Sequence, residues 1–125
     1  MQGVKMAEEI LRQWYKMRAG GSLLKENGNP RGLYFLDVTD RIEAFLTSLP
    51  ASTAEALRLL YFERLTREEA AEILSISRLR LSNKAYLALL QFCDTFTEEG
   101  MKEIESNIGK LEGIERLLRA ERKAA

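Results

Sequence analysis

The sequence contains no histidine, only one cysteine (Cys93) and only two prolines (Pro30 and Pro50). Without histidine the chain has no imidazole for acid–base catalysis, no Cys–His nucleophile pair and none of the usual zinc ligand sets. A lone cysteine forms no internal disulfide, which is typical of a reducing cytoplasm. We therefore expect a cytoplasmic protein that is not an enzyme and that uses no metal and no other cofactor.

Long apolar runs are also missing. None approaches the length of a membrane span, and the first ten residues, MQGVKMAEEI, lack the apolar centre of a signal peptide. We expect neither membrane insertion nor export. Nineteen lysines and arginines balance nineteen aspartates and glutamates, so bulk charge gives no reason to expect a nucleic acid partner. Any such affinity has to come from a local cluster of charge.

The residues that are abundant favour an all-α fold. Leucine, alanine, glutamate, lysine and arginine dominate, and apolar residues recur at helical spacing. We expect a small helical domain at 1–95 and a C-terminal helical extension at 96–125. Gly20 and Gly21 should end a first helix that starts near Met6. Residues 20–36 hold four glycines and are expected to form a loop. Later helices are expected at about 37–48, 53–65, 66–74, 77–93 and 97–121.

The segment LTREEAAEILSISRLRLSNKAY, residues 65–86, has the outline of a helix-turn-helix at about 66–92. Thr66 with Glu69 matches a capping box that starts a short helix, and Ser77 is a suitable cap for a longer one. We expect the core face of the short helix to contain Ala70, Ala71, Ile73 and Leu74, with Ile76 filling the angle of the turn. Ser75 falls where a left-handed residue is needed, at a cost of about 1 kcal/mol. Ser52 with Glu55 matches a further capping box before the preceding helix.

The longer helix is free of carboxylates, since none occurs between Glu72 and Asp94. On a helical wheel its core side contains Leu81, Ala85, Ala88, Leu89 and Phe92, and its opposite side contains Leu79, Arg80 and Asn83. Arginine reads guanine edges and asparagine reads adenine, while phosphates repel carboxylates. The residues expected to bind DNA are Arg67, Ser77, Arg78, Arg80, Ser82, Asn83 and Lys84. The alternative is that this basic face is only solvated.

The stretch LPASTAEALRLLYFERLTREEAAEILSISRLRLSNKAYLALL resembles region 4 of bacterial sigma factors. Upstream, ILRQWYKMRAGG adds a tryptophan-containing helix and a glycine pair. This order is similar to that of the phage late-gene antiterminators of the Q family and the related RinA/ArpU-type activators. The resemblance covers about residues 8–92, and residues 94–125 extend past the usual end of the family pattern.

The resemblance implies a factor that acts in the bacterial host cell on double-stranded DNA beside a late promoter. Such a factor loads onto RNA polymerase holoenzyme paused by its sigma factor and makes the polymerase ignore pauses and terminators. It also implies that Arg78, Arg80, Ser82, Asn83 and Lys84 read the DNA. Two alternatives stay open: a plain helix-turn-helix activator or repressor, and a helical protein-interaction module.

A second, weaker group of residues is a candidate surface for a protein partner: Trp14, Tyr15, Lys16, Arg18, Tyr86, Leu87 and Leu90. The last three lie on the outward side of the longer helix. We expect the 97–121 helix to fold back over them, and the alternatives are a second copy of the chain or polymerase. The first 36 residues carry six cations against three carboxylates, a surplus suited to nascent RNA.

Overall fold

The computed structural model describes residues 2–124, and the side chains of residues 3–121. Every regular element in this part of the chain is helical, which confirms the expected all-α class. The elements are α1 (Gln2–Arg12), α2 (Trp14–Glu26), α3 (Arg31–Ser48), α4 (Ala51–Leu57), a π-helical turn η1 (Arg58–Phe62), α5 (Arg67–Leu74), α6 (Arg78–Phe96) and α7 (Glu98–Ala124).

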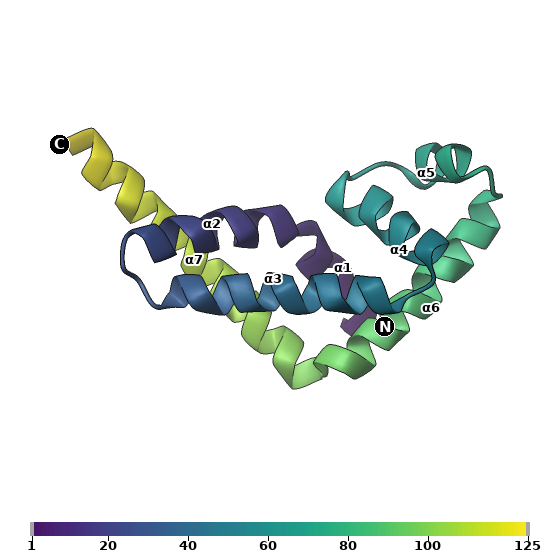
Figure 1. Cartoon of the computed structure of the whole chain (residues 1–125), viewed down its shortest axis with the longest axis horizontal. Coiled ribbons are helices and arrows are strands. Elements are labelled where there is room, and N and C mark those ends of the chain that lie inside the picture. Colours follow the sequence, from purple (N-terminus) through teal and green to yellow (C-terminus); the bar gives the residue numbers. More distant parts are fainter. Residues whose placement is uncertain (1, 125) are drawn as a thin grey trace.

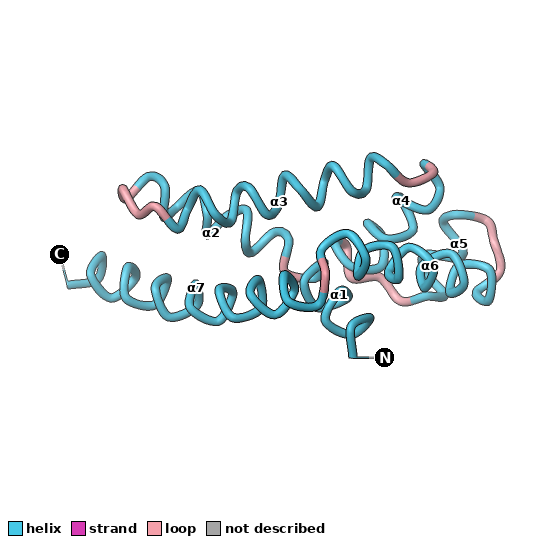
Figure 2. Tube along the Cα trace, turned by 90° about the horizontal axis from the view of Figure 1, so that it is seen from below, coloured by secondary structure: helices cyan, strands magenta, loops and turns pink. Residues whose placement is uncertain are grey.

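The helices separate the molecule into two ends (Figure 1). α2 and α3 form an antiparallel hairpin at one end, and α5 with the first half of α6 lies at the other. The second half of α6 runs back toward the centre and meets α7. From that junction α7 extends along α1 and α2, so that the C-terminus lies at the hairpin end (Figure 2).

The core joins these elements through apolar side chains that are almost fully buried. Phe92 stacks on Phe96 with ring centroids 4.3 Å apart, and the ring of Phe45 from α3 meets Phe92 edge-on at 5.3 Å. The tail contributes an apolar stripe at helical spacing, in which Met101, Ile104, Ile108 and Leu111 are buried. α7 is therefore part of the domain core.

The prediction of a loop at residues 20–36 is wrong. α2 continues to Glu26 and α3 begins at Arg31, so only 27–30 connect them. The glycines serve close packing here: a Cβ on Gly32 would lie 2.5 Å from the backbone nitrogen of Lys25 and 2.6 Å from the carbonyl oxygen of Gly21. Two helices can approach this closely only where side chains are absent, so the glycines that normally break helices hold this hairpin together.

Three further boundaries differ from the expectation. The first helix breaks at Gln13 instead of ending at Gly20, since α1 stops at Arg12 and α2 starts at Trp14. The helix expected at 53–65 is α4 followed by the π-helical turn, in which the N–H of Glu63 donates to the carbonyl of Arg58. Ser52 does not cap α4, because Pro50 occupies the cap position and no side chain accepts a hydrogen bond there.

Candidate nucleic-acid interface

The start of α5 is fixed by the predicted capping box. The Thr66 hydroxyl accepts from the backbone N–H of Glu69 at 3.1 Å, and the Glu69 carboxylate accepts from the backbone N–H of Thr66 at 3.0 Å. The two bonds satisfy donors that a helix start leaves without partners. The bond from the Thr66 backbone N–H also lowers the pKa of Glu69, because it favours the ionised carboxylate.

The turn between α5 and α6 has the expected left-handed residue. Ser75 adopts φ 55° and ψ 42°, and its N–H donates to the carbonyl of Glu72. The N–H of Ile76 reaches back to the carbonyl of Ala71 at 3.1 Å. Ser77 then caps α6, since its hydroxyl accepts from the N–H of Arg80 at 3.1 Å. Three residues thus redirect the chain from a short helix into a long one.

Small buried residues let α5 pack against α6 and the preceding turn. Ala70 and Ala71 are buried, and Ile76 is half-buried against the core, as predicted. The prediction for Ile73 is wrong: its side chain is 57% exposed. The eight residues of α5 make only about two turns, so its core face is narrow and Ile73 falls outside it.

The long helix divides into the two faces that its sequence predicts. Leu81, Ala85, Ala88, Leu89 and Phe92 are all buried. On the other side Leu79 is 72% exposed, and Arg80 and Asn83 are exposed beside it. The side chains of Arg80 and Asn83 make no hydrogen bond or ion pair to any other described residue. Their donors are therefore available to a ligand.

Leu79, Arg80 and Asn83 form the exposed stripe of α6. The remaining predicted DNA-binding residues flank this stripe and make contacts within the chain. A guanidinium nitrogen of Arg67 donates to the Ser82 hydroxyl at 3.3 Å, which ties α5 to α6. Arg78 forms an ion pair with Glu68 at 3.2 Å. Glu68 was not expected in this surface, because its contact with Arg78 depends on the angle at which α5 packs against α6.

A further contact adds a residue that the sequence analysis assigned to another role. The ammonium of Lys84 donates to the hydroxyl of Ser52 at 3.3 Å. Ser52 is exposed at the start of α4, so this helix borders the basic surface. No local motif could have revealed the pairing, because it depends on how α4 packs across α6.

The candidate partner residues of α2 make hydrogen bonds, ion pairs and ring contacts within the chain. The indole N–H of Trp14 donates to the carbonyl of Thr39 at 3.3 Å, and its ring stacks on Phe62 at 4.9 Å. Lys16 forms an ion pair with Glu112 of α7. Arg18 bonds to the Thr39 hydroxyl at 3.0 Å and to the Asp40 carboxylate at 2.6 Å. Tyr15 and Arg18 are both exposed, and the ring of Tyr15, at 54% exposure, meets Trp14 and Phe62 edge-on.

The expectation that the tail covers the outward side of α6 is wrong. Tyr86 is 45% exposed and Leu87 is 62% exposed, because α7 leaves α6 at its C-terminal end and packs on α1 and α2 instead. Leu90 packs against the core. Beside Leu87, a hollow with a volume of about 190 Å³ lies between α4 and α6. Its lining residues are Leu49, Pro50, Thr53, Lys84, Leu87, Ala88 and Gln91.

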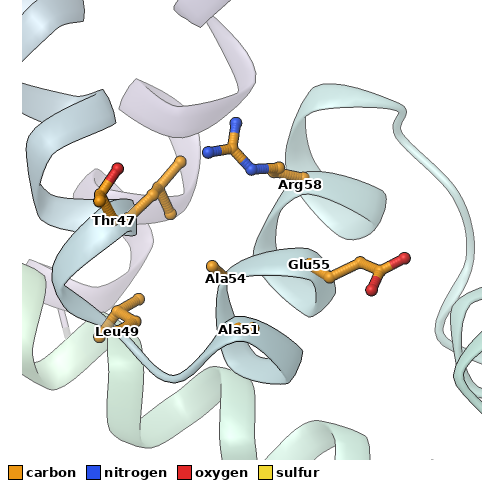
Figure 3. A pocket seen from close by; sticks show the side chains of 7 residues that line it. Thr47, Leu49, Ala51, Ala54, Glu55 and Arg58 are labelled. Atoms are coloured by element: carbon orange, nitrogen blue, oxygen red, sulfur yellow. The ribbon is translucent and has the colours of Figure 1, made fainter.

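A larger hollow of about 520 Å³ lies between the end of α3 and α4 (Figure 3). The Arg58 guanidinium borders it and is bound at 3.1 and 3.0 Å to the two carboxylate oxygens of Glu43, an interaction that raises the pKa of Arg58. The Glu55 carboxylate points away from the hollow. Its other lining residues are Leu46, Thr47, Leu49, Ala51 and Ala54. This set contains no nucleophile paired with a base.

No three His, Cys, Asp or Glu side chains in the described part of the chain are grouped to hold a metal ion. None of its helices has the length and apolarity that crossing a membrane requires. Cys93 is half-buried, and burial raises the pKa of its thiol. The α5–α6 surface is therefore the best-formed candidate.

Comparisons with protein-family models, with curated proteins and with solved structures find no match to this chain.

Proposed function

We propose that this chain binds double-stranded DNA in the major groove through α6, and that it acts on transcription. One observation carries the proposal. Arg80 and Asn83 lie exposed and side by side on the outward face of α6, with donors that no described residue uses, and the helix has no carboxylate before Asp94. A helix that presents such groups after a short helix and a tight turn suits the groove.

The roles of the individual side chains follow from their chemistry. Arg80 can donate two hydrogen bonds to a guanine edge, and Asn83 can pair with an adenine edge. Arg67, Arg78 and Lys84 flank the stripe and are suited to phosphates on the two sides of the groove. Ser77 and Ser82 add hydroxyls at the same surface. The rest of the neutral molecule adds no net attraction, so affinity depends on this one surface.

The finer proposal is that the chain is a phage-type transcription antitermination factor. It is supported by the resemblance of residues 8–92 to the Q family, in which the DNA element lies beside a late promoter. Its second partner would then be RNA polymerase holoenzyme held at a promoter-proximal pause. The α5–α6 surface equally suits a plain activator or repressor, since nothing in its geometry requires contact with a polymerase.

Two experiments test the proposed DNA binding and the proposed antitermination separately. Fluorescence anisotropy with labelled duplex DNA should reveal binding that weakens steeply as salt rises, because bound cations release counterions from the phosphates. Absence of binding at low salt would contradict the DNA proposal and favour a protein-interaction module. Transcription in vitro through a distant terminator separates the finer alternatives: read-through that needs a promoter-proximal element supports antitermination, and occupancy without read-through supports a plain regulator.

A further inference from the structure

Leu79 lies on the same exposed face of α6 as Arg80 and Asn83, but the hydrogen bonds proposed for those residues give it no role. At 72% exposure it is more exposed than any other large apolar side chain in the described part of the chain. It lies in the first turn of α6, between Arg78 and Arg80, while the core position of that turn is filled by Leu81, which is fully buried. Leu79 therefore contributes nothing to the core, and water is an unfavourable neighbour for it.

The neighbours of Leu79 indicate what could cover it. Two guanidinium groups flank it in sequence, which favours a polyanion over an apolar protein surface. Asn83 follows four residues later and so lies on the same helical face. The major groove of DNA offers one apolar group on its base edges, the 5-methyl group of thymine.

We propose that Leu79 is a specificity-determining residue that packs on a thymine methyl group in the major groove. The inference rests on the proposed DNA binding and names part of the site that is bound. Residues four apart on a helix are about 6 Å apart along its axis, and base pairs are stacked about 3.4 Å apart. The thymine should thus lie within about two base pairs of the base that Asn83 contacts.

The test removes the methyl group and nothing else. A site is first selected from a pool of random duplexes, and each thymine in it is then replaced in turn by deoxyuridine, which keeps the pairing and the hydrogen-bonding groups. We expect one or two positions at which the affinity of the unaltered protein falls about fourfold, the effect of uncovering one methyl group. Leu79→Ala should bind the thymine and deoxyuridine duplexes equally.

Leu87→Ala is the matched control, because it removes the same side chain from an exposed position two turns further along the same helix. It should keep the full sensitivity to deoxyuridine. Circular dichroism should show that both variants are folded, since neither leucine is buried.

The possible failures are distinguishable. If the unaltered protein binds the thymine and deoxyuridine duplexes equally at every position, or if Leu79→Ala keeps the sensitivity, the inference is overturned while DNA binding stands. If Leu79→Ala binds the selected site as well as the unaltered protein does, Leu79 belongs to a protein contact instead. If the unaltered protein binds no duplex at low salt, the proposed function itself fails.

Discussion

The guanidinium of Arg78 lies 3.2 Å from the carboxylate of Glu68, and this ion pair joins the first turn of α6 to the first turn of α5. Both side chains are largely exposed, at 64% and 78%, so the pair contributes little to stability. Its position matters more than its strength. Glu68 places a negative charge beside a cation that we assign to phosphate, so under the proposed function it would compete with DNA for Arg78.

Replacing Glu68 by glutamine should therefore strengthen DNA binding. We expect Glu68→Gln to raise affinity roughly two- to fivefold at low salt, with less effect at high salt, while the free energy of unfolding changes by no more than about 0.5 kcal/mol. Anisotropy titrations and urea unfolding measure the two quantities. Glu99→Gln is the control, since it removes the same charge in the first turn of α7, which follows the C-terminal end of α6. Equal affinities of all three proteins would show that Arg78 and Glu68 do not face DNA.

The capping box at Thr66 should be more important for stability than the similar sequence at Ser52. Thr66→Ala removes the hydroxyl that accepts from Glu69 and should lower the free energy of unfolding by about 1 kcal/mol. Ser52→Ala should cost less than about 0.5 kcal/mol, because Ser52 caps no helix. Urea unfolding of both variants gives the comparison. A larger loss for Ser52→Ala would contradict the assignment of Thr66 as a capping residue and of Ser52 as a residue that caps no helix.

The same capping box predicts a pH dependence. Hydrogen bonds from Thr66 hold the pKa of Glu69 below its ordinary value of 4.5 in the folded chain. The stabilisation that depends on its charge is complete above the unfolded pKa and is lost as pH falls through the lower folded pKa. Glu69→Gln keeps a capping side chain but cannot titrate there. The difference in unfolding free energy between the natural protein and this variant should shrink from about pH 5 downward. Parallel curves over that range would contradict the assignment.

Replacing Gly32 by alanine should lower the free energy of unfolding, whereas replacing Gly109 by alanine should raise it. A Cβ at position 32 would meet backbone atoms of α2 at 2.5 and 2.6 Å, so Gly32→Ala should cost more than about 2 kcal/mol as the hairpin is forced apart. A Cβ at position 109 in α7 has nothing within 4 Å, and Gly109→Ala should add up to about 1 kcal/mol through helix propensity. Thermal unfolding compares them, and a mild effect at position 32 would refute the close approach of α2 and α3.

These two glycines also show where sequence reasoning succeeds and where it fails. The helix-turn-helix elements were predictable because their signals are local: Thr66 and Glu69 cap one helix, and Ser77 caps the next. The α2–α3 hairpin was missed because Gly21 and Gly32 are read locally as helix breakers, whereas their role depends on a partner helix distant in sequence. The break at Gln13 has no glycine or proline to reveal it.

The candidate site divides in the same way. The exposure of Arg80 and Asn83 follows from helical periodicity, and the structure confirms it. The contacts of Glu68 with Arg78 and of Ser52 with Lys84 depend on the angles at which neighbouring helices pack. The exposure of Tyr86 and Leu87 depends on the direction in which α7 leaves α6, which the apolar stripe of the tail does not encode.

We propose that Arg80 and Asn83 on the exposed face of α6 read DNA, and the double variant Arg80→Ala/Asn83→Ala removes both of these side chains. Its affinity for the selected duplex should fall at least tenfold relative to the natural protein, because each base contact contributes about 1–3 kcal/mol of discrimination. Its weak binding to unrelated duplex at low salt should largely remain, and Lys110→Ala on α7 should behave like the natural protein. If the double variant binds the selected duplex with unchanged affinity, α6 does not read DNA.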